Sequence, residues 1–98
     1  MRLSADEISA IKAVTVDVFG PDAVVRLFGS RVDDRRRGGD IDLHIEVRGG
    51  RPDYQQEGRF CWYLMRKIGE RAIDIVFHDP DAKLRPIDQK ARRQGIIL

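Results

Sequence analysis

The sequence has one cysteine and no long apolar stretch. These two features argue against a disulfide-stabilised protein and against a membrane-spanning one. Its single cysteine, Cys61, cannot form a disulfide within the chain, which favours a reducing compartment. No apolar run approaches the roughly 18 residues that cross a membrane. The N-terminal segment also lacks the apolar core of a signal peptide. We therefore expect a cytoplasmic protein that has no membrane partner.

Several common ligand-binding motifs are also missing. The sequence contains no Gly-x4-Gly-Lys-Ser/Thr phosphate loop and no Gly-x-Gly-x2-Gly dinucleotide fingerprint. His44, His78 and Cys61 lack the spacing of a zinc site. Since His44 lies on the same predicted strand face as nearby carboxylates but further along, we expect it to be peripheral to any site.

Length, composition and charge are those of a small globular domain. The 98 residues are enough for one domain, residues 1–98, with its own core. Hydrophobic residues make up 42% of the chain and charged residues 35%. The 18 basic and 16 acidic residues nearly balance, so the net charge of +2 is weak evidence for a nucleic-acid partner.

The order of the predicted elements indicates an α/β domain. Ser4 and Glu7 form a capping box for a helix that ends near Phe19, where Gly20 and Pro21 supply a stop. Because the link between the first two predicted strands is short, we expect that pair to be antiparallel and the sheet to be small, mixed and flanked by helices. The other expected elements are strands at 23–28, 40–47 and 72–77, helices at 57–69 and 85–94, and a short edge strand at the end.

Three aspartates lie on two of the predicted strands. Asp40 and Asp42 are two residues apart, so their side chains point the same way, with Cα atoms about 6.6 Å apart. Asp74 interrupts an otherwise apolar strand, although aspartate is a poor strand former. If the two strands are neighbours, the three carboxylates converge.

Clustered carboxylates repel one another, and a hard divalent cation would relieve that repulsion. Two Mg²⁺ ions about 3.5–4 Å apart can bind such carboxylates and clamp the oxygens of an in-line displacement at phosphorus. Gly29 and Ser30, directly after a predicted strand, would let the backbone approach a phosphate and donate hydrogen bonds to it. Arg31 is the best-placed arginine for a phosphate contact, whereas the arginines at 35–37 resemble an ordinary solvated loop.

Taken together, these residues resemble the motif of the minimal nucleotidyltransferases, a compact branch of the DNA polymerase β-like superfamily. The family pattern is a strand, Gly-Ser, a spacer, Asp-x-Asp on the next strand and a third aspartate on a later strand. Here the pattern is Gly29-Ser30, Asp40-Ile41-Asp42 and Asp74, and the resemblance covers about residues 23–98. Many relatives have a serine directly before the first aspartate. This chain has Gly38-Gly39 instead, which should loosen the turn without removing a metal ligand.

The resemblance implies a polymerase β-like fold and transfer of AMP from ATP to a hydroxyl group. By that resemblance Gly29 and Ser30 would hold the β,γ-phosphates, and Asp40 and Asp42 would bind two Mg²⁺ ions. Asp74 would bind the catalytic ion near the acceptor hydroxyl. Family members of this size are typically antitoxins that adenylylate a tyrosine of a HEPN ribonuclease toxin. The resemblance thus implies ATP and a cognate HEPN toxin as partners, in a hetero-oligomer.

Two other functions stay open at this point. The same fold could neutralise a toxin by binding alone, with its carboxylates catalytically idle. A small basic nucleic-acid-binding domain is the third possibility, with the arginines as its footprint. We do not expect direct nucleic-acid binding, because carboxylates in the cleft would repel phosphate unless a metal ion intervenes. Larger relatives carry a second domain that holds the acceptor, so we expect the acceptor here to bring its own binding surface.

Overall fold

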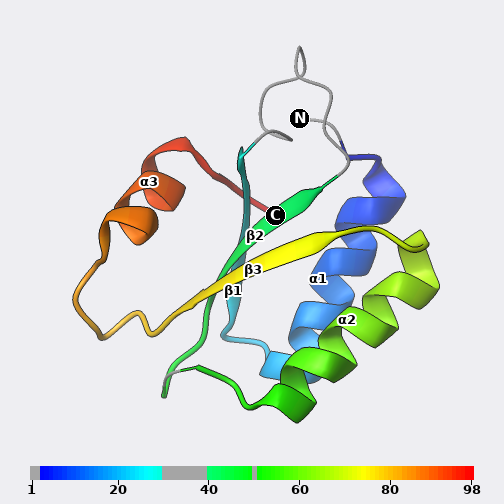
Figure 1. Cartoon of the computed structure of the whole chain (residues 1–98), viewed down its shortest axis with the longest axis horizontal. Helices are drawn as coiled ribbons and strands as arrows, with labels where there is room; N and C mark the ends of the chain where they lie inside the picture. Colours follow the sequence, from blue (N-terminus) through cyan, green and yellow to red (C-terminus); the bar gives the residue numbers. More distant parts are fainter. Residues whose placement is uncertain (1–2, 30–39, 50) are drawn as a thin grey trace.

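A computed structural model of the chain describes residues 3–29, 40–49 and 51–98. Along these ranges three helices and four strands follow one another, and no described helix is long and apolar enough to cross a membrane (Figure 1). The elements are α1 (Ala5–Phe19), β1 (Val24–Phe28), β2 (Ile41–Glu46), α2 (Tyr54–Ile68), β3 (Ile73–His78), α3 (Pro86–Gln94) and β4 (Ile96–Ile97).

The strands form one mixed sheet in the order β3-β2-β1-β4. β1 is antiparallel to both β2 and β4, whereas β2 and β3 run parallel. The prediction of a small mixed α/β sheet flanked by helices is therefore confirmed, and so is the antiparallel first pair. This arrangement is compatible with a small α/β nucleotidyltransferase-like fold.

The first helix begins and ends where its sequence signals predict. The Ser4 hydroxyl accepts a hydrogen bond from the Glu7 N–H, and the Glu7 carboxylate accepts one from the Ser4 N–H. At the other end the Gly20 N–H donates to the Val16 carbonyl. Both ends of α1 are thus capped by hydrogen bonds, as the sequence predicts.

The start of the second helix was predicted wrongly. The Gly and Pro content of residues 48–56 indicated a loop, but α2 already begins at Tyr54. Asp53 and Gln56 form a second capping box, in which the Gln56 N–H donates to the Asp53 carboxylate at 2.8 Å. An Asp three residues before a Gln is the same kind of signal as the first capping box, and it outweighs the nearby proline and glycines.

The apolar face of the sheet forms the core with α1 and α2, while α3 lies across the opposite face (Figure 1). Ile41, Leu43 and Ile45 alternate along β2 and are fully buried on the core face. Burying each such side chain stabilises the fold by about 1.5–3 kcal/mol. The helices contribute Ile11, Val14, Phe60 and Leu64.

Two glycines offer a matched test of this packing. At Gly95 an added Cβ would lie 2.3 Å from the Ala91 carbonyl oxygen, whereas at Gly58, inside α2, nothing lies within 4 Å. We expect Gly95→Ala to lower the free energy of unfolding by about 1–3 kcal/mol, because the backbone must move. Gly58→Ala should raise it by about 0.5–1 kcal/mol through helix propensity. Urea denaturation of both variants checks this, and equal effects would contradict the close packing at the end of α3.

Candidate active site at the carboxylate cluster

Asp42 and Asp74 lie side by side in the sheet. They are direct register partners in the parallel pair of β2 and β3, so their side chains share one face about 4.8 Å apart along the hydrogen-bonding direction. Asp40 precedes β2 and is exposed. Asp74 is exposed and Asp42 is half-buried. The structure thus brings together the two aspartates that the sequence places on different strands.

Gly29 lies against the Asp42 carboxylate. It directly follows β1, in which Phe28 is the register partner of Asp42. Its φ of +78° is in the left-handed region, and an added Cβ would lie 2.2 Å from Asp42 Oδ2. Only glycine leaves that space to the carboxylate. Ser30 and Arg31, the other two residues predicted for phosphate contact, lie outside the described residues.

The electrostatics of the cluster disfavour a charge on Asp42. Burial raises the pKa of the Asp42 carboxyl, and the charges of Asp74 and Asp40 together with a hydrogen bond to Asp74 raise it further. Carboxylate oxygens gathered in this way are the ligands that Mg²⁺ prefers, and a cation would relieve their repulsion. By their donor chemistry, Asp42 and Asp74 therefore suit a hard cation such as Mg²⁺.

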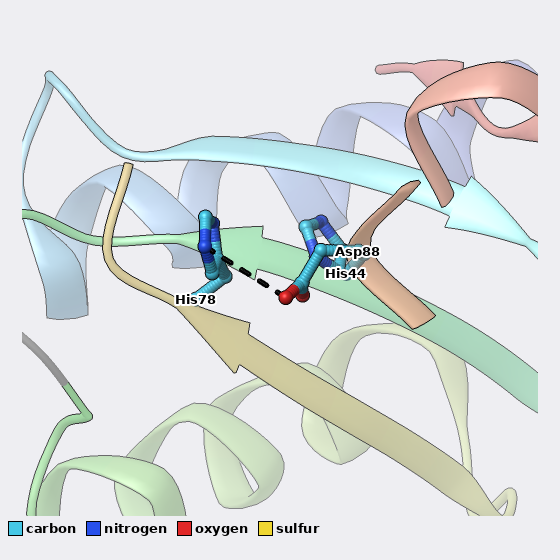
Figure 2. A group of neighbouring side chains, drawn as sticks. All are labelled: His44, His78 and Asp88. Carbon is cyan, nitrogen blue, oxygen red and sulfur yellow. Dashed lines mark hydrogen bonds and ion pairs between the residues drawn. The ribbon is translucent and has the colours of Figure 1, made fainter. Parts of the chain in front are cut away.

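A second cluster lies on the same face of the sheet, further along the strands and beneath α3 (Figure 2). His44, His78 and Asp88 come from β2, β3 and α3, and one ligand atom of each lies within 4.8 Å of the others. Within the described ranges these three residues form a group that could hold a metal ion. Asp40, Asp42 and Asp74 do not form such a group. By distance the triad could hold a metal ion.

His44 lies apart from the aspartate pair, but it is buried, which the sequence did not indicate. Its side chain is fully buried, and its Nε2 lies 2.8 Å from Asp88 Oδ1. The strand pattern could not show this, because the partner Asp88 is 44 residues away on α3. Alternation along β2 placed His44 on the polar face, but only the position of α3 makes that face buried.

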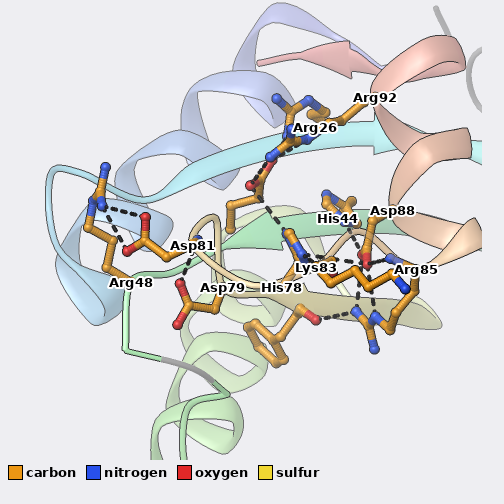
Figure 3. A network of polar contacts seen from close by, with 12 residues as sticks. Arg26, His44, Arg48, His78, Asp79, Asp81, Lys83, Arg85, Asp88 and Arg92 are labelled. Carbon is orange, nitrogen blue, oxygen red and sulfur yellow. Dashed lines mark hydrogen bonds and ion pairs between the residues drawn. The ribbon is translucent and has the colours of Figure 1, made fainter.

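Arginines neutralise both buried carboxylates on this face (Figure 3). Arg85 binds both oxygens of Asp88, with its Nε 2.8 Å from Oδ2 and its Nη2 3.0 Å from Oδ1. Arg92 binds both oxygens of Glu46, at 3.2 and 2.7 Å, and Arg26 also pairs with that carboxylate. Burial by itself would raise the pKa of Glu46, but hydrogen bonds from Arg92, Arg26 and His78 lower it to about 2.

These charges make the network a poor metal site. Three arginines face two carboxylates, so a divalent cation would join a group that already carries one excess positive charge. A metal on His44 Nε2 would also require a proton on Nδ1, which is buried and has no hydrogen-bond partner. We therefore interpret the network of Glu46 and Asp88 as the attachment of α3 to the sheet.

Comparison with known proteins adds no family assignment. No known protein family matches the chain, and no curated protein sequence matches it either.

Replacing Asp42 tests the repulsion in the cluster. Because the pKa of Asp42 is raised in the folded state, a proton on Asp42 stabilises the fold. This contribution is complete below about pH 4 and is lost as the pH rises through the folded-state pKa. We expect Asp42→Asn to raise the melting temperature at pH 7 by roughly 4–8 °C, the shift given by about 1 kcal/mol in a domain of this size. The gain should shrink toward pH 4. Thermal unfolding against pH checks this, with exposed Asp22→Asn as the control. A lower melting temperature for Asp42→Asn would contradict the repulsion.

Replacing Glu46 tests the attachment of α3. Because its pKa is lowered, Glu46 stabilises the fold above about pH 4.5, and this contribution is lost as the pH falls toward 2. We expect Glu46→Gln to cost about 2–4 kcal/mol at pH 7, since two arginines lose their buried partner. Asp81→Asn breaks the exposed pair with Arg48 and should cost less than about 0.5 kcal/mol. Urea denaturation at several pH values separates the two variants, and equal costs would refute the structural role of Glu46.

Proposed function

We propose that this chain is a Mg²⁺-dependent nucleotidyltransferase that transfers AMP from ATP to a hydroxyl group of a partner protein. The observation that carries the proposal is the placement of Asp42 beside Asp74, with Gly29 against the Asp42 carboxylate. The sequence resemblance supplies the donor and the acceptor class. It also suggests the acceptor, a tyrosine of a cognate HEPN toxin, for which the chain would act as the antitoxin.

The three aspartates have different surroundings, and these suggest different roles. Asp42 is half-buried between Gly29 and Asp74, so its carboxylate has little freedom to move. Asp74 is exposed on β3 and can meet a group that arrives from outside. When bound, two Mg²⁺ ions would neutralise the triphosphate and orient its α-phosphorus. Asp40 and Asp42 would hold both ions, and Asp74 would hold the ion nearer the acceptor.

The reaction balances without a further reactant. The acceptor oxygen forms a bond to the α-phosphorus of ATP, the bond from that phosphorus to the bridging oxygen breaks, and pyrophosphate leaves. The hydroxyl proton passes to a carboxylate, and Asp74 is the exposed member of the cluster that can accept it. Gly29 would admit the phosphates close to the backbone, and we assign Ser30 and Arg31 to the same task.

Substitution of Asp74 tests the assignment directly. We expect Asp74→Asn to lower AMP transfer at least about a hundredfold, the loss typical of removing one group that stabilises charge in a transition state. Binding of the partner and the melting temperature should not fall, since Asp74 is exposed and its charge is repelled by Asp42. The measurement is the intact mass of a co-purified partner protein after incubation with ATP and Mg²⁺.

Exposed Asp22→Asn is the matched control and should transfer AMP like the wild-type chain. Undiminished transfer by Asp74→Asn would remove Asp74 from the site. A tight complex whose partner gains no mass with any nucleoside triphosphate would favour an antitoxin that acts by binding alone.

A further inference from the structure

β3 is an edge strand of the described sheet, and half of its backbone groups point outward. In the parallel pair the Ile41 N–H donates to the Ala72 carbonyl, and the Val47 N–H donates to the His78 carbonyl. Even-numbered residues of β3 therefore direct their N–H and C=O groups toward β2. By the same alternation Ile73, Ile75 and Phe77 direct theirs away from the sheet.

One end of this edge is covered and the other is open. The outward carbonyl of Phe77 accepts a hydrogen bond from Arg85 Nη2 at 2.6 Å. In the described part of the chain no strand pairs with the outer edge at Ile73 and Ile75. An open edge of this kind is a template for another extended chain.

The open part of the edge lies next to the aspartate cluster. Asp74 sits between Ile73 and Ile75, and its side chain lies on the face that carries Asp42. On a strand added beside β3, the residue opposite Asp74 would have its Cβ about 4.5–5.5 Å away, with its side chain on the same face. A hydroxyl on that residue would reach the Asp74 carboxylate.

We propose that an extended segment of the acceptor protein adds to the outer edge of β3 and places its hydroxyl residue opposite Asp74. Backbone hydrogen bonds to Ile73 and Ile75 would hold the segment in register. Binding of the segment is argued from the open edge of β3 alone, whereas transfer of AMP to it rests on the proposed function.

Charge indicates what kind of segment fits. Asp40, Asp42 and Asp74 make this end of the edge acidic. A segment with basic residues around its hydroxyl is therefore favoured over an acidic one. A second copy of this chain is a poor occupant, because pairing of two β3 strands about a two-fold axis near Asp74 brings the two Asp74 carboxylates together.

Amide hydrogen exchange measured by NMR tests the binding step, with an internal control in the same strand. In the free protein the amides of Asp74, Val76 and His78 should exchange slowly, and those of Ile73 and Ile75 quickly. The probe is the peptide acetyl-Lys-Val-Tyr-Val-Lys-amide at millimolar concentration. We expect it to slow exchange at Ile73 and Ile75 severalfold and to leave the amides of Asp74 and Val76 unchanged.

Unchanged exchange at Ile73 and Ile75, or protection confined to other elements, would overturn the proposal. Protection by the same peptide with glutamate in place of lysine would overturn its charge preference. Concentration-dependent protection without peptide would show that a second copy occupies the edge, contrary to the proposal.

Variants at the first residue of β3 provide a second test. Ile73→Pro removes an outward N–H that β2 does not use, and proline is tolerated at the start of an edge strand. It should weaken peptide binding severalfold, whereas Ile73→Val keeps the N–H and should bind like the wild-type chain. Equal peptide affinity of the two variants would overturn the edge assignment.

Incubation of the peptide with ATP and Mg²⁺ separates the two proposals. AMP on the tyrosine together with protection at Ile73 and Ile75 supports both. Protection without AMP transfer keeps the docking edge and counts against the proposed function. AMP transfer without protection keeps the proposed function and overturns the docking edge. The peptide with phenylalanine in place of tyrosine should protect the edge equally and receive no AMP.

Discussion

The register of the parallel pair of β2 and β3 determines which side chains meet on each face of the sheet. It makes Asp42 the partner of Asp74 and His44 the partner of Val76. A shift of one residue would turn the side chains of β3 to the other face, burying Asp74 in the core and exposing the apolar residues. Ile73, Ile75 and Phe77 pack on the core face of β3 and prevent that shift, so the apolar core also determines the geometry of the carboxylate cluster.

Two carboxylates on the polar face of the sheet, Glu46 and Asp42, have opposite electrostatic surroundings. Beneath α3, Arg26 and Arg92 surround Glu46, which stays ionised far into acid. At the other end of the same strands, burial and two neighbouring carboxylates act on Asp42, and its pKa is raised. The first arrangement is complete without a ligand and stabilises the attachment of α3. The second leaves a repulsion that a cation would relieve, as the proposed function requires.

Because β3 is at the edge of the sheet, a partner chain that pairs with it would lie next to the carboxylates of Asp42 and Asp74. Its outward backbone groups lie within one residue of Asp74, and Arg85 covers the far end of the edge. A chain that pairs with the open end would bring its side chains to the carboxylates without a separate acceptor-binding domain. In the proposed function the same strand would serve catalysis through its side chain and recognition through its backbone.

The elements whose signals are local could be predicted from the sequence alone. The Ser4 capping box, the alternation along β2 and the apolar run of β3 specify α1 and the strands, because each depends on neighbouring residues. The Asp53 capping box is an equally local signal, and it starts α2 at Tyr54 despite the neighbouring proline and glycines. The pair of Asp42 with Asp74 was foreseeable only on the condition that β2 and β3 are neighbours. The contact of Gly29 with Asp42 and the burial of His44 beside Asp88 could not be predicted, since each joins residues that are far apart in the chain. Their formation depends on strand order and on which face α3 covers, and no local propensity encodes either.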